Sequence, residues 1–520
     1  MSERRHTDGA TPATGTPATG VPANGGPSDN GHRAARDADQ RASDGGHRAV
    51  DDGGQRASDG GQRAVDDGGQ RASDGGQRAV DDGGDRAVSG GPAYVGKPDY
   101  DRPDEDDDVR LRRQAALVLA VLAALILAVA ALATPWQALL TAGDPPDPAR
   151  DFTAAQLARA QAFDAATSLP GYLSLALTVL VAGLLVATPL GARATRRLRG
   201  PWWLRTILAV VVIAAATLAL RWPLGMWFET VLREYGLSTQ TWPSWSGDRL
   251  KNAAVETFLL ALTITVLVAL ARRFRRWWIP AATGAFALTV AASFVYPVVF
   301  EPMFNDFTPM REGPLRTSLL AMAARDGVPV EDVLVADASR RTTALNAYVS
   351  GFGATRRVVV YDTLLRAPDA EVELVVAHEL GHAKHDDVLH GTLLGGLGAA
   401  LGAVLLFLIF DLVRRRAAVP SIADPRAAGA LMGLMSLGTL LGPAQNVVSR
   451  HVEARADLHA LELTRDPSTF VAMQKRLAIS NISDLSPDAV EYVLYASHPS
   501  GPERIAMARA WARLNGVPAP

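Results

Sequence analysis

The hydropathy of the chain changes near residue 109, where a polar N-terminal stretch gives way to a series of long apolar segments. The first of them, residues 115–133, is almost uninterrupted and long enough to cross a bilayer as a helix. Similar runs follow at 171–190, 203–221, 253–271, 280–300, 391–413 and 427–445. One such run could be the buried helix of a soluble protein. Several runs of about 18 or more residues in one chain instead predict an integral membrane protein with about seven helical spans.

The last two apolar runs are rich in glycine. They contain Gly395, Gly396, Gly398 and Gly402 in the first, and Gly429, Gly433 and Gly438 in the second. Small residues let the backbones of membrane helices approach closely. We therefore expect these two segments to pack tightly against neighbouring helices.

Residues 1–108 have low sequence complexity and few large apolar side chains. A 15-residue unit, RASDGGHRAVDDGGQ or a close variant, begins at residues 41, 56 and 71. Each unit offers only Ala and Val for burial, which cannot offset the entropy lost on ordering the chain. A stacked solenoid would need an apolar face that these units lack. The pattern therefore predicts a disordered tail, and no early apolar segment indicates a signal peptide.

A polar stretch at residues 301–390 separates the fifth and sixth apolar runs. It contains a predicted helix at 315–326 and two predicted strands, at 333–336 and 357–361. Residues 446–520 are again polar, with a largely helical pattern. The predicted organisation is a tail at 1–108, five spans within 109–300, a polar domain at 301–390, a hairpin of two spans at 391–445, and a C-terminal part at 446–520.

The amino-acid composition limits which metal ligands and which partners the chain can have. The chain has no cysteine, so disulfides and thiolate ligands are excluded and a transition metal would be held by histidines and carboxylates. The formal net charge of −2 averages a polar tail with an apolar remainder, and nothing in it indicates a nucleic-acid partner. Arginine supplies nearly all the positive charge. With abundant Ala and Gly, this usage indicates a GC-rich bacterial source and hence a bacterial plasma membrane.

His378, Glu379 and His382 form an HExxH motif inside an apolar helical stretch that follows Pro368. Two histidines four residues apart on a helix project from one face and can hold one Zn²⁺. Glu379 adjoins the first histidine, where its carboxylate can act as a general base toward a water activated by the ion. Because the chain has only 10 histidines in 520 residues, the motif rarely arises by chance, which favours a zinc site over a helix that merely carries two histidines.

The motif leaves zinc short of one protein ligand. His385 and His390 are nearby, but a continuous helix cannot bring His385 onto the same ion as His378. A distant carboxylate is the better candidate. Glu453 and Asp457 lie four residues apart and face the same way on a predicted helix. One of them can bind zinc while the other orients a ligand histidine or the reacting group.

An ordinary charged helix face is the alternative interpretation of this C-terminal segment. In that case Glu453 would pair with a neighbouring arginine, Arg450 or Arg455. Spacing alone does not decide between the two interpretations.

Taken together, the motifs resemble the integral-membrane zinc endopeptidases typified by the type I CAAX prenyl protease. The sequence HELGH is followed by Asn446, Ser449, Arg450, Glu453, Ala456 and Asp457 in the spacing of that family. Further matches occur in the same order at 236–240, at 304–309, at 346–348, at 359–364, at 498–500 and at 503–505. The resemblance covers about residues 150–515 and leaves the repeat tail outside.

This resemblance implies a mostly α fold: a polytopic transmembrane helical bundle with an α+β, gluzincin-like zinc protease domain. The domain would be formed by residues 301–390 together with the C-terminal helical region. His378, His382 and Glu453 would then bind one Zn²⁺ per chain, and Glu379 would be the catalytic base.

The resemblance implies roles for three more residues. Asp457 would be the second catalytic acidic residue, as a proton donor or as a support for the ligands. His498 would stabilise the oxyanion or hold substrate, and Asn346 would lie on an edge strand that pairs with the substrate backbone. A loop histidine before proline and a turn asparagine are the plain alternatives for the last two.

The expected activity is hydrolysis of peptide bonds in polypeptides that are hydrophobic or associated with the lipid bilayer. Prenylated C-termini are one possible class of substrate, and membrane-inserted proteins under quality control are another; the sequence leaves both open. A non-catalytic membrane scaffold with a degenerate zinc fold is the alternative from a different class. The intact Glu379 beside two histidines favours the enzyme.

Arginines cluster at 110–113, 193–205, 272–276 and 414–416, at alternate ends of the predicted spans. The positive-inside rule puts all four clusters on the cytoplasmic side, and the zinc domain on the outer side. The family that the chain resembles is described with its protease domain facing the cytoplasm or an intramembrane chamber. The side of the active site is therefore left open.

Overall fold

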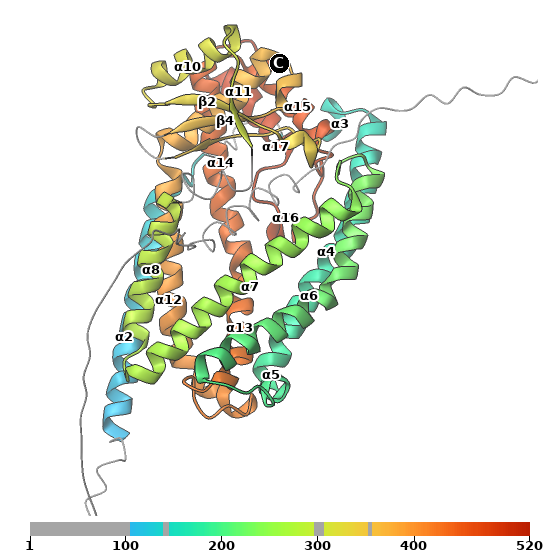
Figure 1. Ribbon diagram of the computed structural model, residues 1–520. Helices are drawn as coiled ribbons and strands as arrows, with labels where there is room; N and C mark the ends of the chain where they lie inside the picture. The colour runs from blue at the N-terminus through green and yellow to red at the C-terminus, as the bar shows by residue number, and fades with distance from the viewer. Residues whose placement is uncertain (1–104, 139–144, 296–305, 352–355) are drawn as a thin grey trace, which may run out of the picture. The chain divides into compact units, whose positions relative to one another are not determined.

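The computed structural model describes residues 105–138, 145–295, 306–351 and 356–520. The predicted disordered tail lies almost wholly outside the described residues. Residues 113–520 belong to one compact unit, in which a bundle of long helices adjoins a smaller α+β layer (Figure 1).

The expected seven spans are confirmed as seven helical segments that are long and apolar enough to cross a membrane. They are α2 Glu105–Ala133, α4 Ala154–Ala187, α6 Trp202–Glu234, α7 Trp242–Arg273, α8 Trp278–Val295, α12 Asp387–Arg416 and the composite segment Pro425–Thr464. The composite segment comprises η5 Pro425–Ala427, α13 Ala428–Leu437, η6 Gly438–Leu441 and α14 Gly442–Thr464. Two short helices, α3 Pro148–Asp151 and α5 Leu190–Thr195, lie between spans.

Several of these helices are longer than the apolar runs that predicted them. A helix of 34 residues such as α4 is about 51 Å long, whereas the hydrocarbon core is about 30 Å thick. The extra turns of α4 carry Ala160 and Phe163 into the core of the α+β layer. Likewise, the expected boundaries at 390/391 and 445/446 fall inside α12 and α14, which run on without a break.

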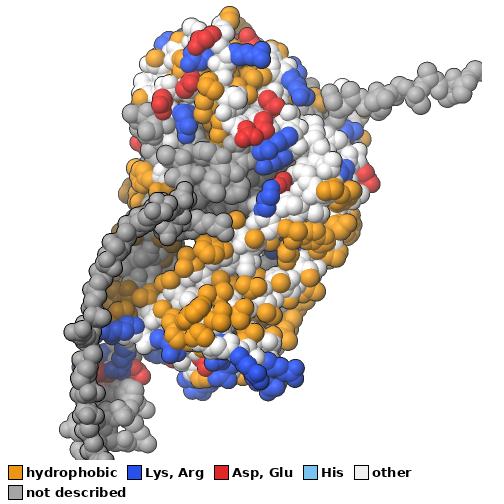
Figure 2. All heavy atoms as spheres, in the orientation of Figure 1, with side chains coloured by type: hydrophobic (Ala, Val, Ile, Leu, Met, Phe, Trp, Pro, Cys, Tyr) orange, Lys and Arg blue, Asp and Glu red, His pale blue; other side chains and the backbone are white. Residues whose placement is uncertain are grey.

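The outer surface of the bundle is apolar. Leu127, Leu180, Leu220 and Phe258 are large hydrophobic side chains that remain exposed on four different helices. Figure 2 shows hydrophobic side chains covering the face of the bundle that α7 crosses. Such a surface is suited to lipid contact.

Some of the glycines in the last two spans provide close helix contacts, as expected. A Cβ atom at Gly433 would lie 2.7 Å from the carbonyl oxygen of Ala182, and one at Gly429 would lie 2.9 Å from the Cα of Gly191. Gly396 similarly faces the ring of Phe286. Three other glycines make no such contact, because a Cβ at Gly398, Gly402 or Gly438 would meet no described atom within 4 Å.

The α+β layer contains a four-stranded sheet in the order β1-β2-β4-β3. Its elements are β1 Phe307–Pro309, α10 Pro314–Asp326, β2 Asp332–Ala336, η2 Ala338–Arg340, β3 Ala347–Ser350, β4 Arg357–Tyr361 and η4 Leu364–Arg366. Strands β2 and β4 are parallel, and the two outer strands are antiparallel to them. The predicted helix and the two predicted strands are confirmed. Short β1 was not predicted, because a three-residue strand carries no alternating pattern.

Helix α11 Asp369–Lys384 lies between this sheet and the C-terminal helices. Its buried residues Val372, Val376 and Leu380 share one apolar core with Val358 and Val360 of β4. The predicted helical character of the C-terminal part is confirmed by α14, α15 Pro467–Ser480, α16 Ala489–Leu494 and α17 Gly501–Leu514. The sheet and these helices enclose α11, so the HExxH motif lies inside the α+β layer.

The close helix contact at Gly433 generates a test. Gly433→Ala should lower stability by about 1–3 kcal/mol, because the added methyl group meets the Ala182 backbone, which cannot move aside cheaply. Gly438→Ala, at an open position, should be neutral or slightly stabilising. Thermal unfolding of both variants in detergent measures the difference. Equal midpoints for the two would contradict the packing.

Candidate metal centre

Two helices bring the motif residues together. α11 carries His378 and His382, and α14 crosses it with Glu453; their ligand atoms all lie within 4.8 Å of one another. The crossing is close because Gly381 stands at the contact. A Cβ atom there would lie 3.1 Å from both the Cα of Ala456 and the Cβ of His459. The glycine of HELGH therefore lets α14 come near enough for Glu453 to reach the histidines.

Hydrogen bonds fix the orientation of both imidazoles. His378 Nδ1 lies 2.8 Å from Asp457 Oδ1, and His382 Nδ1 lies 3.0 Å from Asp387 Oδ2. An Nδ1–H that donates to a carboxylate leaves Nε2 with its lone pair available. The two Nε2 atoms face each other at 3.2 Å, and Glu453 Oε2 lies 3.2 Å from His378 Nε2.

This arrangement fits a metal cation. Two imidazole lone pairs and a carboxylate repel one another at such distances unless positive charge lies among them. Glu453 Oε2 is buried and forms no hydrogen bond with any described residue, which would be costly without a cation. Two histidines and one glutamate are also a known donor set for catalytic zinc, with one position left for water or substrate.

The charges around the histidines also favour a positive centre. Burial lowers the pKa of His378, but the neighbouring carboxylates of Asp457 and Glu453 outweigh it and raise the pKa to about 10. The pKa of His382 is raised as well. Burial lowers the pKa of His382, but the charge of Glu453 and the hydrogen bond to Asp387 raise the pKa by more than burial lowers it. The site is thus suited to a proton or a metal ion, and a metal must displace the proton to bind.

An Arg–Asp pair supports each of the two histidines of the motif. Asp457 is fully buried and accepts a hydrogen bond of 2.7 Å from Arg504 Nε at Oδ2. Asp387 in turn accepts a hydrogen bond from Arg455. This geometry favours the supporting role for Asp457 over that of proton donor.

Sequence reasoning missed Asp387. The available signal was an aspartate five residues after His382, together with an arginine two residues after Glu453. These spacings matter only once α12 and α14 are known to meet at the site.

The surroundings of Glu453 differ from those of an ordinary charged helix face. Arg450 donates to the carbonyl oxygens of Tyr492 and Ala496, and Arg455 binds Asp387. Neither arginine is paired with Glu453. His385 lies outside the group, as expected, with its ring 5.7 Å from that of His459.

The remaining predicted site residues lie around this centre. Glu379 is partly exposed beside His378; burial raises its pKa, against the opposing charges of His382 and His378. His498 Nε2 lies 3.1 Å from Glu453 Oε2, on the loop before α17. Asn346 directly precedes the edge strand β3, and its carbonyl oxygen accepts a hydrogen bond from the Tyr361 amide.

Another group of acidic side chains is found elsewhere in the described residues. Asp164, Asp484 and Glu491 bring carboxylate oxygens within 4.8 Å of one another. They offer no imidazole, and zinc prefers nitrogen or sulfur donors. The histidine-containing group is therefore the better candidate for a transition metal.

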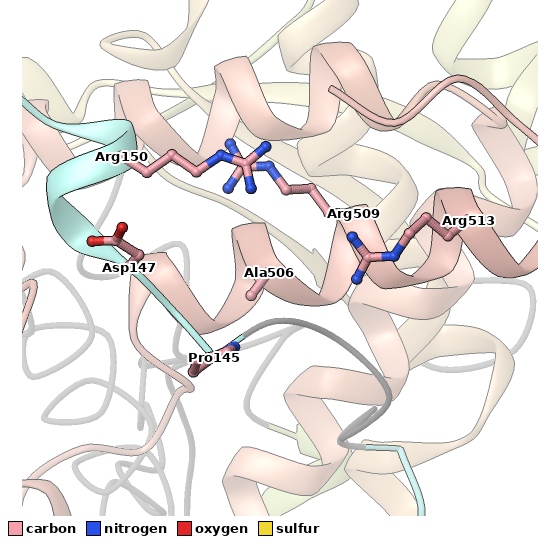
Figure 3. A pocket seen from close by; sticks show the side chains of 6 residues that line it. All are labelled: Pro145, Asp147, Arg150, Ala506, Arg509 and Arg513. Carbon is pink, nitrogen blue, oxygen red and sulfur yellow. The ribbon is translucent and has the colours of Figure 1, made fainter.

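A pocket of about 290 Å³ lies against α17 (Figure 3). Its lining includes Arg150, Arg509 and Arg513. Arg509 is already engaged, because it forms two hydrogen bonds with Asp151 and a third with the carbonyl oxygen of Pro520. This pocket holds an internal ion pair and presents no histidine or nucleophile.

Known proteins share both halves of this architecture. The sequence model of Peptidase family M48 matches residues 309–512, and the model described as "CAAX prenyl protease N-terminal, five membrane helices" matches residues 137–306. An uncharacterised metalloprotease of Bacillus subtilis, YhfN, is 30% identical over 314 residues, which cover 58% of this chain and 73% of that protein.

Eukaryotic relatives and a solved structure are also similar. CAAX prenyl protease 1 of Saccharomyces cerevisiae is 27% identical over 54% of this chain and 67% of its own length. The rice homolog is 34% identical, but the match spans only 53% of its length. The crystal structure of S. mikatae Ste24p shares the fold, with a TM-score of 0.61 at 20% identity over 76% of this chain and 98% of that one.

The matched regions contain six of the seven candidate spans, the HExxH helix and the helix that carries Glu453. The chain therefore belongs to peptidase family M48 and is a membrane-embedded zinc metalloendopeptidase.

Proposed function

We propose that the chain hydrolyses peptide bonds of membrane-associated or hydrophobic polypeptides with one Zn²⁺ held by His378, His382 and Glu453. The observation that carries this proposal is the convergence of two hydrogen-bonded imidazoles and one buried, unbonded carboxylate oxygen. When bound, zinc would polarise the scissile carbonyl group and lower the pKa of water. The scaffold alternative is not favoured, because Glu379 stands beside both histidines.

The side chains around the candidate metal centre transfer the proton and orient the imidazoles. Glu379 takes the proton of the attacking water and returns it to the leaving amine. Its burial raises its pKa, which suits a group that must both accept and donate a proton near neutral pH. Asp457 and Asp387 keep the imidazoles in the tautomer that presents Nε2.

Substrate position follows from the two surfaces near the centre. His498 adjoins Glu453 and so lies where a carbonyl oxygen near the ion would develop negative charge. Asn346 directly precedes the edge strand β3, where an extended peptide can add a further strand.

The cellular setting also belongs to this proposal. Glu453 stands on a helix that continues from a membrane span, so a polypeptide at the centre is held next to the lipid. The composition and the Bacillus relative support a bacterial plasma membrane. In that membrane we expect hydrophobic membrane proteins to be the substrates. Comparing a prenylated with an unmodified peptide tests whether the enzyme prefers prenylated substrates.

The first experiment tests the catalytic base. Glu379→Gln should lower peptide cleavage by about 10²-fold to 10⁴-fold, because a neutral amide cannot take a proton, while zinc content is kept. Purified protein would receive a farnesylated CAAX peptide and an unmodified membrane-protein fragment. Glu373→Gln, on the same helix, is the control and should cleave normally. Full activity of Glu379→Gln would refute the assignment, and the preferred peptide would separate the two substrate classes.

The second experiment tests the support of His382. Asp387→Asn should weaken zinc binding by about 10-fold to 100-fold, because the amide no longer fixes the imidazole tautomer. The neighbouring Asp386→Asn is a matched control, since Asp386 is exposed and binds Arg356 instead. Competition with a fluorescent zinc chelator measures the affinity. Equal affinities for both variants would remove Asp387 from the site.

The third experiment separates substrate contacts from metal binding. Asn346→Ala should raise KM with little change in kcat, because it acts on the docked peptide. His498→Ala should lower kcat by about 10²-fold if it stabilises developing negative charge. Both variants should retain zinc. Zinc loss in His498→Ala would mean that this residue supports Glu453 rather than substrate.

A further inference from the structure

One face of α14 carries more than the candidate metal ligand. Asn446, Arg450, Glu453 and Asp457 follow one another at intervals of four, three and four residues, so they share one side of the helix. All four residues are buried. Glu453 and Asp457 belong to the candidate metal centre, whereas Asn446 and Arg450 contact the end of α16 and the segment after it.

The charge of Arg450 is directed at backbone carbonyl groups instead of a carboxylate. Its Nη1 lies 3.0 Å from the carbonyl oxygen of Tyr492 and 2.6 Å from that of Ala496. The guanidinium carbon also lies 4.4 Å from the centre of the Tyr492 ring. Arg450 forms no ion pair with any described residue. Two carbonyl dipoles and an aromatic face therefore stabilise its buried charge.

Asn446 contacts the same segment from one turn earlier on α14. Its Nδ2 lies 2.9 Å from the carbonyl oxygen of Leu494 and 3.4 Å from that of Val493. The last carbonyl groups of a helix have no partner within it, so donors from outside fix the helix end. In this way α16 is fixed against α14 (Figure 1), and four carbonyl groups between residues 492 and 496 bind two side chains of α14.

The fixed segment ends two residues before His498. Ser497 Oγ lies 2.8 Å from His498 Nδ1, and His498 Nε2 lies 3.1 Å from Glu453 Oε2. On its other side the histidine is close to the start of α17, where Ser500 and Glu503 form a capping box. His498 therefore lies between a segment that α14 fixes and a capped helix end.

A single rigid helix thus sets the positions of both Glu453 and His498. Arg450 precedes Glu453 by three residues, less than one turn. Through Ala496, it also fixes the backbone from which His498 projects. A displacement of about 1 Å in a group that acts on the reacting atoms can lower a rate by about 10²-fold. The imidazole should therefore depend on this backbone contact for its effect.

We propose that Arg450 is a positioning residue of the active site, which acts through His498 and is assisted by Asn446. Its hydrogen bonds keep the imidazole beside Glu453, where a peptide carbonyl oxygen would develop negative charge. Arg450 itself contacts neither substrate nor metal in this proposal. The inference rests on the role proposed above for His498.

The kinetic test combines two substitutions. Arg450→Gln should lower kcat by about 10-fold to 100-fold with zinc content and KM nearly unchanged, because His498 loses its position. In the His498→Ala background, the same substitution should change kcat by less than about twofold, since the group that it positions is gone. Arg450→Lys should recover part of the loss, because both carbonyl groups bind one nitrogen, which a lysine ammonium can replace.

Arg509→Gln is the matched control. Arg509 is 9% exposed and Arg450 is 7% exposed, but Arg509 binds Asp151 and the carbonyl oxygen of Pro520. The control should lower the unfolding temperature and leave kcat unchanged. Equal losses from Arg450→Gln in the parent and in His498→Ala would overturn the positioning role and leave that of His498 intact. Full kcat in His498→Ala would instead refute the proposed role of His498, and this inference with it.

A second measurement follows the segment without any activity. Hydrogen–deuterium exchange of the full chain in detergent should be faster at residues 493–498 in Arg450→Gln, and less so in Asn446→Ala, with α11 unchanged. Asn446→Ala removes no charge, so it provides the same test if Arg450→Gln does not fold. It should also lower kcat, by less than Arg450→Gln does. Unchanged exchange of the segment in both variants would overturn its fixation by α14.

Discussion

The crossing of α11 and α14 at Gly381 is the contact on which the site depends. A side chain larger than hydrogen at this position would press on the α14 backbone at Ala456. Because the helices meet there, Glu453 comes within reach of the histidines that α11 presents. The like-charged and lone-pair-bearing atoms gathered at this crossing are stable together only with positive charge among them.

That demand extends beyond the ligands. Arg504 donates hydrogen bonds to Asp457, and Arg455 donates to Asp387. Each motif histidine is therefore hydrogen-bonded to a carboxylate that is itself paired with an arginine. The carboxylates and arginines of these pairs come from α12, α14 and α17, which are separate elements of the sequence. The candidate metal centre therefore lies where three of the C-terminal helices meet.

The continuity of α12 and α14 through the membrane couples the centre to the lipid. Each helix carries apolar residues in the bundle and a functional carboxylate near the site, Asp387 on one and Glu453 on the other. A tilt of either span would move a group of the site. Close glycine contacts at Gly429 and Gly433 oppose such a tilt, because backbones in direct contact leave little room to slide.

Sequence by itself determined the features that have a local period. The seven apolar runs, the HExxH spacing and the strands at 333–336 and 357–361 follow from patterns within a few residues, and these were predicted correctly. The family resemblance predicted Glu453 as a metal ligand. Its spacing in the sequence alone did not distinguish this role from that of an ordinary charged residue on a helix face. Only the tertiary structure decided that Asp387 and Arg455 support His382, and that α14 crosses α11 closely enough for Glu453 to reach both histidines. These are contacts between segments distant in the chain, and no local pattern encodes how such segments meet.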